Sequence, residues 1–100
     1  MPHPELGNTV LVHYTGWLAN ADHTLGKQID SSVERKKRLE FVVGLHDVIK
    51  GMEQGVMLMR VGEKSRFVIP SELAYGKNGV GFVVPPHATL IFEIELLAMK

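Results

Sequence analysis

The sequence predicts an α+β domain in which one antiparallel β-sheet packs against one short α-helix. Four segments of the chain alternate apolar and polar residues, which is typical of strands that bury one face and leave the other in water. One segment, from about residue 47 to residue 59, instead repeats its apolar residues at intervals of three and four, as an amphipathic helix does.

The first strand is predicted over residues 9–18, where β-branched and aromatic residues alternate with polar ones. One face carries Val10, Val12, Tyr14 and Leu18, and the other carries Thr9, His13 and Thr15. The next stretch, residues 19–28, includes Asn20, Asp22, Gly26 and Lys27, and this polar composition favours a loop.

Three later segments complete the predicted sheet. Residues 39–43 alternate Leu39, Phe41 and Val43 with Glu40 and Val42. Residues 65–69 set Phe67 and Ile69 against Ser65 and Arg66, and Pro70 stops this strand because proline cannot donate to a ladder. The last strand, residues 90–97, has Leu90, Phe92, Ile94 and Leu96 on one face and Glu93 and Glu95 on the other.

The helical segment carries Val48, Ile49, Met52, Val56 and Met59 on one side, opposite Lys50, Glu53 and Gln54. Asp47 is a candidate N-cap, because its carboxylate could accept from the first free N–H groups. Gly51 and Gly55 each weaken a helix by up to about 1 kcal/mol relative to alanine, so we expect this helix to lie close against the sheet.

Composition limits the domain count and the kind of partner. The chain has 100 residues, 45% of them hydrophobic, which predicts a single domain over residues 1–100. Its formal net charge is zero, which argues against a nucleic-acid or anionic-membrane partner. There is no cysteine, no apolar run near the roughly 20 residues of a membrane helix and no visible signal peptide. We therefore expect a cytoplasmic protein, with the nucleus as the other compartment that the sequence allows.

Most motifs of catalytic or metal chemistry are absent from the sequence. It has no nucleophile elbow, P-loop, zinc-protease or dinucleotide motif, and its five histidines are scattered without the spacing of ligands, so no metal site is predicted. Residues 35–38 form a run of four cations. Such a run could serve nuclear localisation or phosphate binding, although a solvated loop is its commoner setting.

Several segments, in order, resemble the FKBP family of immunophilins. They are residues 12–16 (VHYTG), residues 30–32 (DSS), Gly44 followed by residues 47–51 (DVIKG), residues 61–64 (VGEK), residues 74–76 (AYG) and residues 85–90 (PPHATL). Each piece alone is weak, but the ordered set is specific and extends from about Gly7 to Lys100. The resemblance implies a twisted antiparallel sheet wrapped around one short helix, with an apolar pocket between them.

The resemblance also implies peptidyl-prolyl cis–trans isomerase (rotamase) activity without a cofactor, in the service of protein folding. The uncatalysed barrier to rotation about an X-Pro bond is roughly 18–20 kcal/mol. A rotamase lowers it with a dry apolar pocket and a few fixed donors that favour the twisted, less polar amide. The implied partners are proline-containing peptides or proteins, and macrolides of the tacrolimus and rapamycin type.

Carried over by resemblance, the residues implied in catalysis are Tyr14, Asp30, Ile49, Tyr75 and Phe92. Tyr75 would donate its hydroxyl, and Ile49 its backbone N–H, to substrate carbonyls. Asp30 would face Tyr14 and Arg35 in a polar network that orients the site without transferring protons. The residues implied in ligand binding are Ile29, Arg35, Leu39, Phe41, Asp47, Val48, Met52, Val80, Val83 and Val84.

The sequence departs from the family pattern at three places. Met52 stands where the family usually has the tryptophan of the pocket floor, and Ile29 and Leu39 replace phenylalanines, so we expect weaker binding of macrolides. The loop over residues 19–28 is longer than usual. The family strand that precedes Gly7 is missing or shortened here, which would leave a shorter sheet edge.

Two alternatives stay open at this stage. The apolar residues of the site would be ordinary core residues in most α+β domains, and Asp30 with Arg35 could be a surface pair worth about 0–1 kcal/mol. The altered floor also allows a catalytically weak FKBP-like module that binds a protein partner through the loop from Val80 to Val84.

Overall fold

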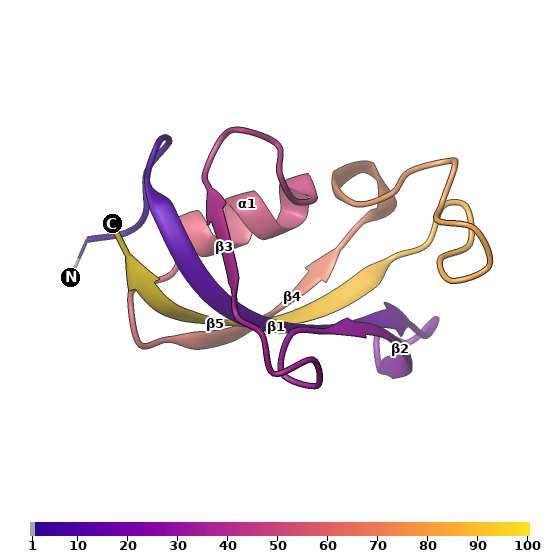
Figure 1. Ribbon diagram of the computed structural model, residues 1–100. Helices are drawn as coiled ribbons and strands as arrows, with labels where there is room; N and C mark the ends of the chain where they lie inside the picture. The colour runs from indigo at the N-terminus through magenta and orange to yellow at the C-terminus, as the bar shows by residue number, and fades with distance from the viewer. Residues whose placement is uncertain (1) are drawn as a thin grey trace.

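A computed structural model describes residues 2–100 and confirms the predicted α+β class (Figure 1). The five strands are β1 (Thr9–Ala19), β2 (Leu25–Ser31), β3 (Leu39–Val42), β4 (Lys64–Ile69) and β5 (Leu90–Met99). The helix α1 (Lys50–Met57) lies between β3 and β4 in the chain, and a short 3-10 helix, η1 (Ser71–Leu73), follows β4. In Figure 1 the sheet curves along one side of α1, and both termini lie at the same end of the molecule.

All strand pairs in the sheet are antiparallel, and its order is β2-β1-β5-β4. The long strand β1 holds the sheet together, because it pairs with β5 along its whole length on one edge. On its other edge it pairs with β3 near its start, from Thr9 to Val12, and with β2 near its end, from Thr15 to Ala19. The first and the last strands of the chain, β1 and β5, therefore lie side by side.

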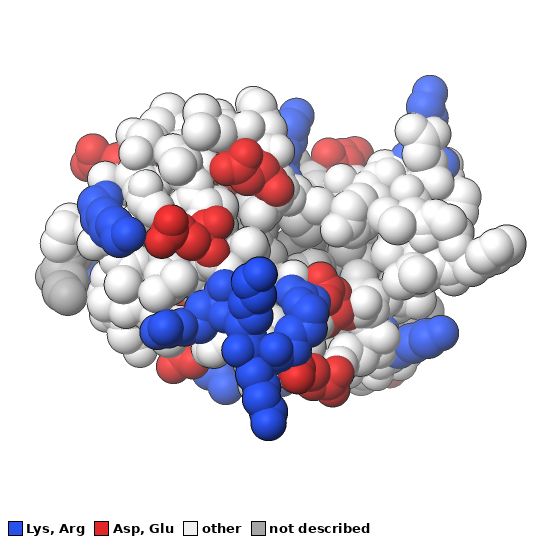
Figure 2. All heavy atoms as spheres, viewed as in Figure 1, with Lys and Arg blue, Asp and Glu red and all other residues white. Residues whose placement is uncertain are grey.

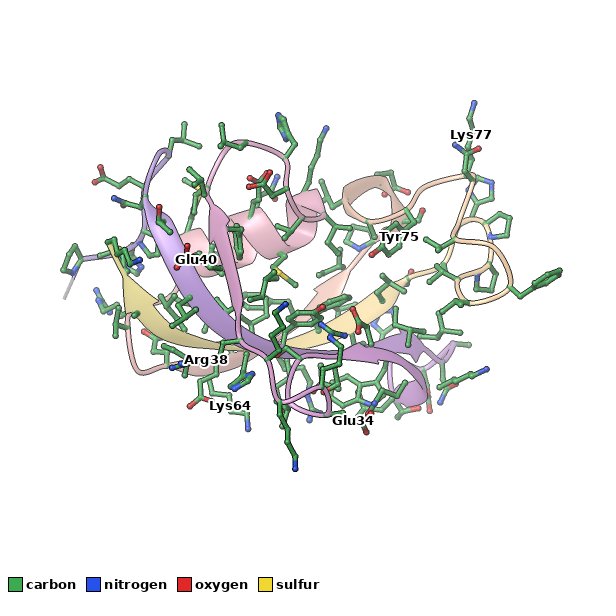
Figure 3. The ribbon with its side chains drawn as sticks, in the orientation of Figure 1. Glu34, Arg38, Glu40, Lys64, Tyr75 and Lys77 are labelled. Atoms are coloured by element: carbon green, nitrogen blue, oxygen red, sulfur yellow. The ribbon has the colours of Figure 1, made fainter. Side chains whose placement is uncertain are left out.

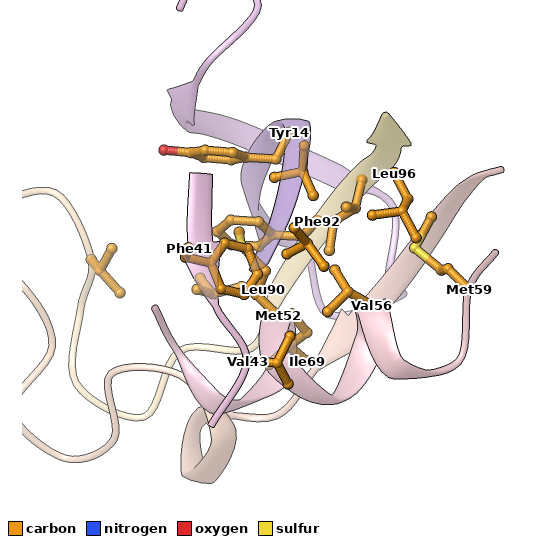
Figure 4. Packing of buried hydrophobic residues seen from close by; sticks show 14 residues of the cluster. Tyr14, Phe41, Val43, Met52, Val56, Met59, Ile69, Leu90, Phe92 and Leu96 are labelled. Carbon is orange, nitrogen blue, oxygen red and sulfur yellow. The ribbon is translucent and has the colours of Figure 1, made fainter. Parts of the chain in front are cut away.

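The core lies between the inner face of the sheet and α1 (Figure 4). The alternation predicted for the last strand is confirmed, since Leu90, Phe92, Ile94 and Leu96 are all buried. Strand β1 contributes Val10, Val12 and Tyr14 to the same cluster, and the helix contributes Met52 and Val56. Burial of apolar side chains from both layers is the main stabilising term of this fold.

The helix begins later than the sequence pattern suggests. Its N-cap is Ile49, in an extended conformation, so the prediction of Asp47 as N-cap is wrong. Gly44 and His46 have positive φ angles of 98° and 60°, and the chain stays irregular from these residues to Val48. The prediction of Glu53 on the exposed side of the helix is also wrong, because Glu53 is only 7% exposed.

The two helix glycines lie against β4, as the sequence predicts for a helix in close contact with the sheet. A Cβ atom on Gly51 would lie 2.4 Å from Cγ2 of Ile69, and one on Gly55 would lie 3.2 Å from the ring of Phe67. Only residues without a side chain allow α1 to approach β4 this closely.

Two details of the predicted strands are corrected by the structure. Residues 25–28 belong to β2 and not to a loop; the strand was missed because it is an edge strand with mostly exposed polar residues and therefore little apolar alternation. In β4, Ser65 shares the inner side with Phe67 and Ile69, while Arg66 and Val68 face outward, because side chains alternate strictly along a strand.

Candidate functional site

A cavity of about 210 Å³ opens between α1, the central strands and the loops that connect them. Strand β1 supplies Tyr14, β2 supplies Asp30 and β5 supplies Phe92, so three neighbouring strands form one wall. Figure 3 shows Tyr75 on the loop after η1, and this residue closes the cavity from the opposite side. The lining residues are Tyr14, Asp30, Leu39, Asp47, Val48, Ile49, Met52, Tyr75 and Phe92.

The floor and the inner wall of the cavity are apolar. Met52 of α1 and Phe92 of β5 are each only 3% exposed. The ring of Phe92 lies 5.8 Å from that of Tyr14, with an interplanar angle of 22°, so the two rings stack. Gly16 makes room for this arrangement, since a Cβ there would lie 2.7 Å from the ring of Phe92. In Figure 4 the hydroxyl of Tyr14 points away from the core that its ring helps to form.

A polar network lies at the rim, formed by Tyr14, Asp30 and Arg35. The Tyr14 hydroxyl donates to Oδ2 of Asp30 over 2.6 Å, and Nη2 of Arg35 donates to the Tyr14 hydroxyl over 2.9 Å. The other guanidinium nitrogen, Nη1, is paired with Oδ1 of Asp30. The guanidinium carbon also lies 5.7 Å from the centre of the Tyr14 ring. Each member holds the other two, which fixes the position of the Tyr14 ring.

The electrostatics of this network keep Asp30 charged and both cavity tyrosines neutral. Burial alone would raise the pKa of Asp30, but the hydrogen bonds from Tyr14 and Arg35 outweigh it and hold the pKa below its ordinary value. Burial, followed by the hydrogen bond to Asp30, raises the pKa of Tyr14. Burial, with the charge of Asp30 as a smaller cause, also raises the pKa of Tyr75. None of these groups is tuned to exchange a proton near neutral pH.

Two hydrogen-bond donors at the cavity have no partner within residues 2–100. The Tyr75 hydroxyl, on a side chain that is partly exposed, makes no hydrogen bond. Its raised pKa keeps the proton on the oxygen, so the hydroxyl remains a donor. The backbone N–H of Ile49 is also unused, because it lies at the N-cap, where the helix offers no acceptor. A ligand carbonyl that enters the cavity can accept from either donor.

The sequence and the fold both have known counterparts. Residues 2–97 match the model of a protein family described as FKBP-type peptidyl-prolyl cis-trans isomerase. The chain belongs to this family. It is therefore an FKBP-type domain with peptidyl-prolyl cis–trans isomerase activity.

Individual relatives of this FKBP domain cover nearly all of its length. It is 50% identical over 91 residues to a FK506-binding protein of Neisseria meningitidis serogroup B, an alignment that covers 91% of this chain and 79% of the relative. It is 43% identical to the peptidyl-prolyl cis-trans isomerase FKBP1A of Xenopus laevis, with 97% and 85% covered. Among solved structures, FkpA from Escherichia coli superposes with a TM-score of 0.84 at 41% identity, covering 99% of this chain but only 43% of FkpA.

A buried carboxylate that the sequence analysis did not select braces one side of the FKBP cavity. Oε2 of Glu53 accepts hydrogen bonds from the backbone N–H of Gly44, at 2.6 Å, and from that of His46, at 3.3 Å. Its Oε1 lies 3.5 Å from Nδ1 of His46. These residues precede Asp47, Val48 and Ile49, which line the cavity. The sequence indicates this role of Glu53 only through its position directly after Met52, close to the buried side of the helix.

All five residues that the resemblance implies in catalysis line the cavity: Tyr14, Asp30, Ile49, Tyr75 and Phe92. Four of the implied ligand-binding residues, Leu39, Asp47, Val48 and Met52, line it as well, and Arg35 contacts it through the rim network.

Five other residues of that set lie outside the lining. Phe41 and Val84 are buried in the core, and Ile29 packs against its edge. Val80 and Val83 are exposed on the loop between η1 and β5, which folds back on itself through a bridge between Val80 and Val84. The structure therefore separates a compact cavity from an outer apolar loop.

Within residues 2–100, no cluster of three or more histidine, aspartate or glutamate side chains could hold a metal ion. The same part of the chain contains no helix with the length and apolar character needed to span a membrane.

Proposed function

We propose that this FKBP domain isomerises X-Pro bonds of polypeptides in the cavity between α1 and the sheet, and so assists slow folding steps. The proline ring enters against Phe92 and Met52. Tyr75 and the backbone N–H of Ile49 donate to the carbonyls on either side of it. Asp30 and Arg35 hold Tyr14 in place as the outer wall.

The proposed mechanism needs no proton transfer and no covalent step. Rotation about the X-Pro bond removes amide resonance, so the twisted carbonyl is less polar than the planar one. A dry wall such as the stacked Tyr14 and Phe92 rings disfavours the polar planar form relative to the twisted form. Fixed donors then hold the neighbouring carbonyls while the bond turns, without reorganisation of solvent.

The observation that carries this proposal is the pair of unused donors, Tyr75 and Ile49, that share one cavity with apolar walls. In a cavity that served only as core, a hydroxyl and a backbone N–H would be expected to find partners within the protein. Here both are left for a ligand.

Cis–trans exchange of a short X-Pro peptide, followed by NMR with wild type and Tyr75→Phe, tests the proposal. Loss of one hydrogen bond worth about 0.5–1.5 kcal/mol should lower kcat/KM by about 2- to 10-fold. The midpoint of urea unfolding should change little, since Tyr75 is 39% exposed. Exchange at the buffer rate in the presence of concentrated wild-type protein would exclude the proposed activity.

A second candidate function is a binding module with weak catalysis. It is favoured by the loop that carries Val80, Phe82 and Val83, where Phe82 is completely exposed. Apolar side chains gathered in water are typical of contact surfaces. Under this reading, wild type would bind a protein partner, that binding would survive both Tyr75→Phe and Asp30→Val, and peptide exchange would rise only slightly above its buffer rate.

Further properties of the chain belong to the same proposal. Macrolides of the tacrolimus and rapamycin type would occupy the same cavity, with reduced affinity because Met52, Ile29 and Leu39 are aliphatic. Residues 1–100 would act as one isomerase domain. A cytoplasmic location is supported by a sequence without cysteine, as is common in reducing compartments.

A further inference from the structure

The four consecutive cations Arg35, Lys36, Lys37 and Arg38 form one exposed turn between β2 and β3, which we call the basic turn. Figure 2 shows Lys and Arg side chains gathered on the face of the molecule that carries this turn. The formal net charge of the chain is zero, with eleven basic and eleven acidic residues. The concentration of positive charge is therefore local and is not a property of the whole surface.

Most of the charge on the basic turn is not neutralised by neighbours. Arg35 is paired with Asp30. The side chains of Lys36, Lys37 and Arg38 take part in no ion pair or hydrogen bond within residues 2–100. The acidic residue beyond the turn, Glu40, is instead 3.3 Å from Nζ of Lys100. Three cations thus face solvent together.

The backbone of the basic turn is fixed to β1 and is not a loose loop. Ser32, which is fully buried, donates its N–H to the carbonyl of Tyr14 over 2.9 Å and accepts the N–H of Tyr14 at its hydroxyl over 2.8 Å. Its carbonyl then accepts the N–H of Lys37 over 3.1 Å, and the carbonyl of Ser31 accepts that of Arg35. The cations are held at a fixed position relative to Tyr14.

Both ends of the basic turn touch the cavity. At its start, Arg35 donates to the hydroxyl of Tyr14, the outer wall. At its end, Arg38 is followed by Leu39, which lines the cavity directly. In Figure 3 Arg38 lies where the chain enters β3. The basic turn therefore borders the cavity, within reach of a polypeptide whose proline occupies it.

We propose that the basic turn selects client polypeptides that carry acidic residues next to the isomerised proline. This proposal rests on the proposed function, because it places a client in the prolyl cavity. Lys36, Lys37 and Arg38 attract the flanking carboxylates, and the cavity binds the proline. An extended chain advances only about 3.3–3.6 Å per residue, so carboxylates within a few residues of the proline are the ones within reach.

A polypeptide fits the basic turn better than a nucleic acid or a lipid surface. The turn is short, and the net charge of the chain is zero. Proteins that bind nucleic acids usually carry an excess of basic residues over a broad face, so this composition argues against a nucleic-acid partner. Continuity with a cavity that takes peptide bonds supports a peptide occupant. The charges act from exposed positions, so the effect is moderate and sensitive to salt.

Kinetic measurements on two peptides of equal length test this proposal. Both contain the same X-Pro core; one has glutamate at the flanking positions, and the other has glutamine. In NMR exchange at about 10 mM salt, two or more exposed charge pairs acting together should give the glutamate peptide about 3- to 10-fold higher kcat/KM. The preference should disappear near 1 M salt, where the Debye length is about 3 Å.

A matched pair of variants separates the basic turn from general charge. The double variant Lys36→Gln with Lys37→Gln should lower the preference to less than about twofold and leave turnover of the glutamine peptide unchanged. The control, Lys27→Gln with Lys77→Gln, removes the same charge from other exposed positions and should keep the preference.

Three results would overturn the proposal. Equal kcat/KM for the two peptides with wild type at low salt would do so, as would the same loss of preference in the control variant. In the third, wild type binds a single-stranded oligonucleotide or phosphatidylserine vesicles and shows no preference between the two peptides. The Lys36→Gln, Lys37→Gln variant then no longer binds the oligonucleotide or the vesicles. Turnover of the glutamine peptide in each case shows that the isomerase itself is intact.

Discussion

At the scale of single residues, Met52 lies at the floor of the cavity, where the proposed function places the proline ring. Its thioether chain is adaptable, whereas the tryptophan usual in this family offers a flat and rigid face. Met52 of α1 is almost fully buried and lines the cavity, so an aromatic side chain there would place its ring against a bound ligand.

Met52→Trp should therefore strengthen ligand binding. An aromatic contact adds about 0.5–1.5 kcal/mol, so the Kd for tacrolimus, measured by isothermal titration, should fall by about 2- to 10-fold. Met52→Leu serves as the control, because it keeps an aliphatic floor of similar volume and should leave the Kd within about twofold. Weaker binding by a folded Met52→Trp protein would show that residue 52 does not form the floor for the ligand.

The ionisation of the rim predicts a flat pH profile for catalysis. Hydrogen bonds from Tyr14 and Arg35 outweigh burial and lower the pKa of Asp30, so its charge and the network it stabilises persist as pH falls to the ordinary range of an aspartate and are lost only below it. The pKa values of Tyr14 and Tyr75 are raised, so both hydroxyls keep their protons up to about pH 10. We expect kcat/KM to vary less than about twofold from pH 5 to pH 9, and a bell-shaped curve within this range would contradict a mechanism without proton transfer.

Removal of the Glu53 side chain should disturb the cavity strongly, although Glu53 itself does not line the cavity. Glu53→Ala leaves the N–H groups of Gly44 and His46 without their acceptor, at about 1–3 kcal/mol for each group that stays buried. We expect a loss of about 2–4 kcal/mol in the free energy of unfolding, from urea titration, together with a raised KM. Glu53→Gln keeps an acceptor oxygen and should lose less than half as much. Equal losses in the two variants would exclude a role for the hydrogen bonds.

Much of the site was predictable from the sequence, because short motifs such as those around Tyr14, Asp30 and Tyr75 keep their order along the chain. Glu53 was not, since a carboxylate on a helix is usually exposed and only the three-dimensional path of residues 44–46 shows what it binds. The resemblance also implies ligand binding by Val80 and Val83, which are exposed on the loop between η1 and β5, and this role stays a prediction.

At the scale of elements, the strands with one apolar face were predictable and the others were not. Strands β1 and β5 alternate clearly because their inner faces meet α1. Strand β2 forms through its backbone pairing with β1 and buries little, so its side chains carry no comparable pattern. The helix start was placed too early because a carboxylate in sequence does not show whether the chain has already turned into the helix.

The contact between α1 and β4 gives an element-scale prediction. In Gly51→Ala the new methyl group would overlap the buried side chain of Ile69, while helix propensity improves by about 1 kcal/mol. Overpacking of 1–3 kcal/mol should win, giving a lower midpoint in urea. Gly55→Ala, whose nearest contact is 3.2 Å, should be at least 1 kcal/mol more stable than Gly51→Ala. A Gly51→Ala protein more stable than wild type would mean that α1 and β4 are further apart than described.

At the scale of the whole molecule, the fold brings a wall from β1, β2 and β5, a floor from α1 and a donor from a distant loop to one cavity. The basic turn borders this cavity because β3 must return to pair with the start of β1 directly after it. The candidate site and the basic turn are thus brought together by the same strand order.

The most direct test of the central claim is an NMR titration with a proline peptide, observed at the methyl group of Met52 and the amide of Ile49. Both signals should shift, with one midpoint, over the concentration range in which isomerisation of the peptide saturates. Catalysis that saturates while the Met52 and Ile49 signals stay unchanged would contradict the claim that the bond rotates inside this cavity.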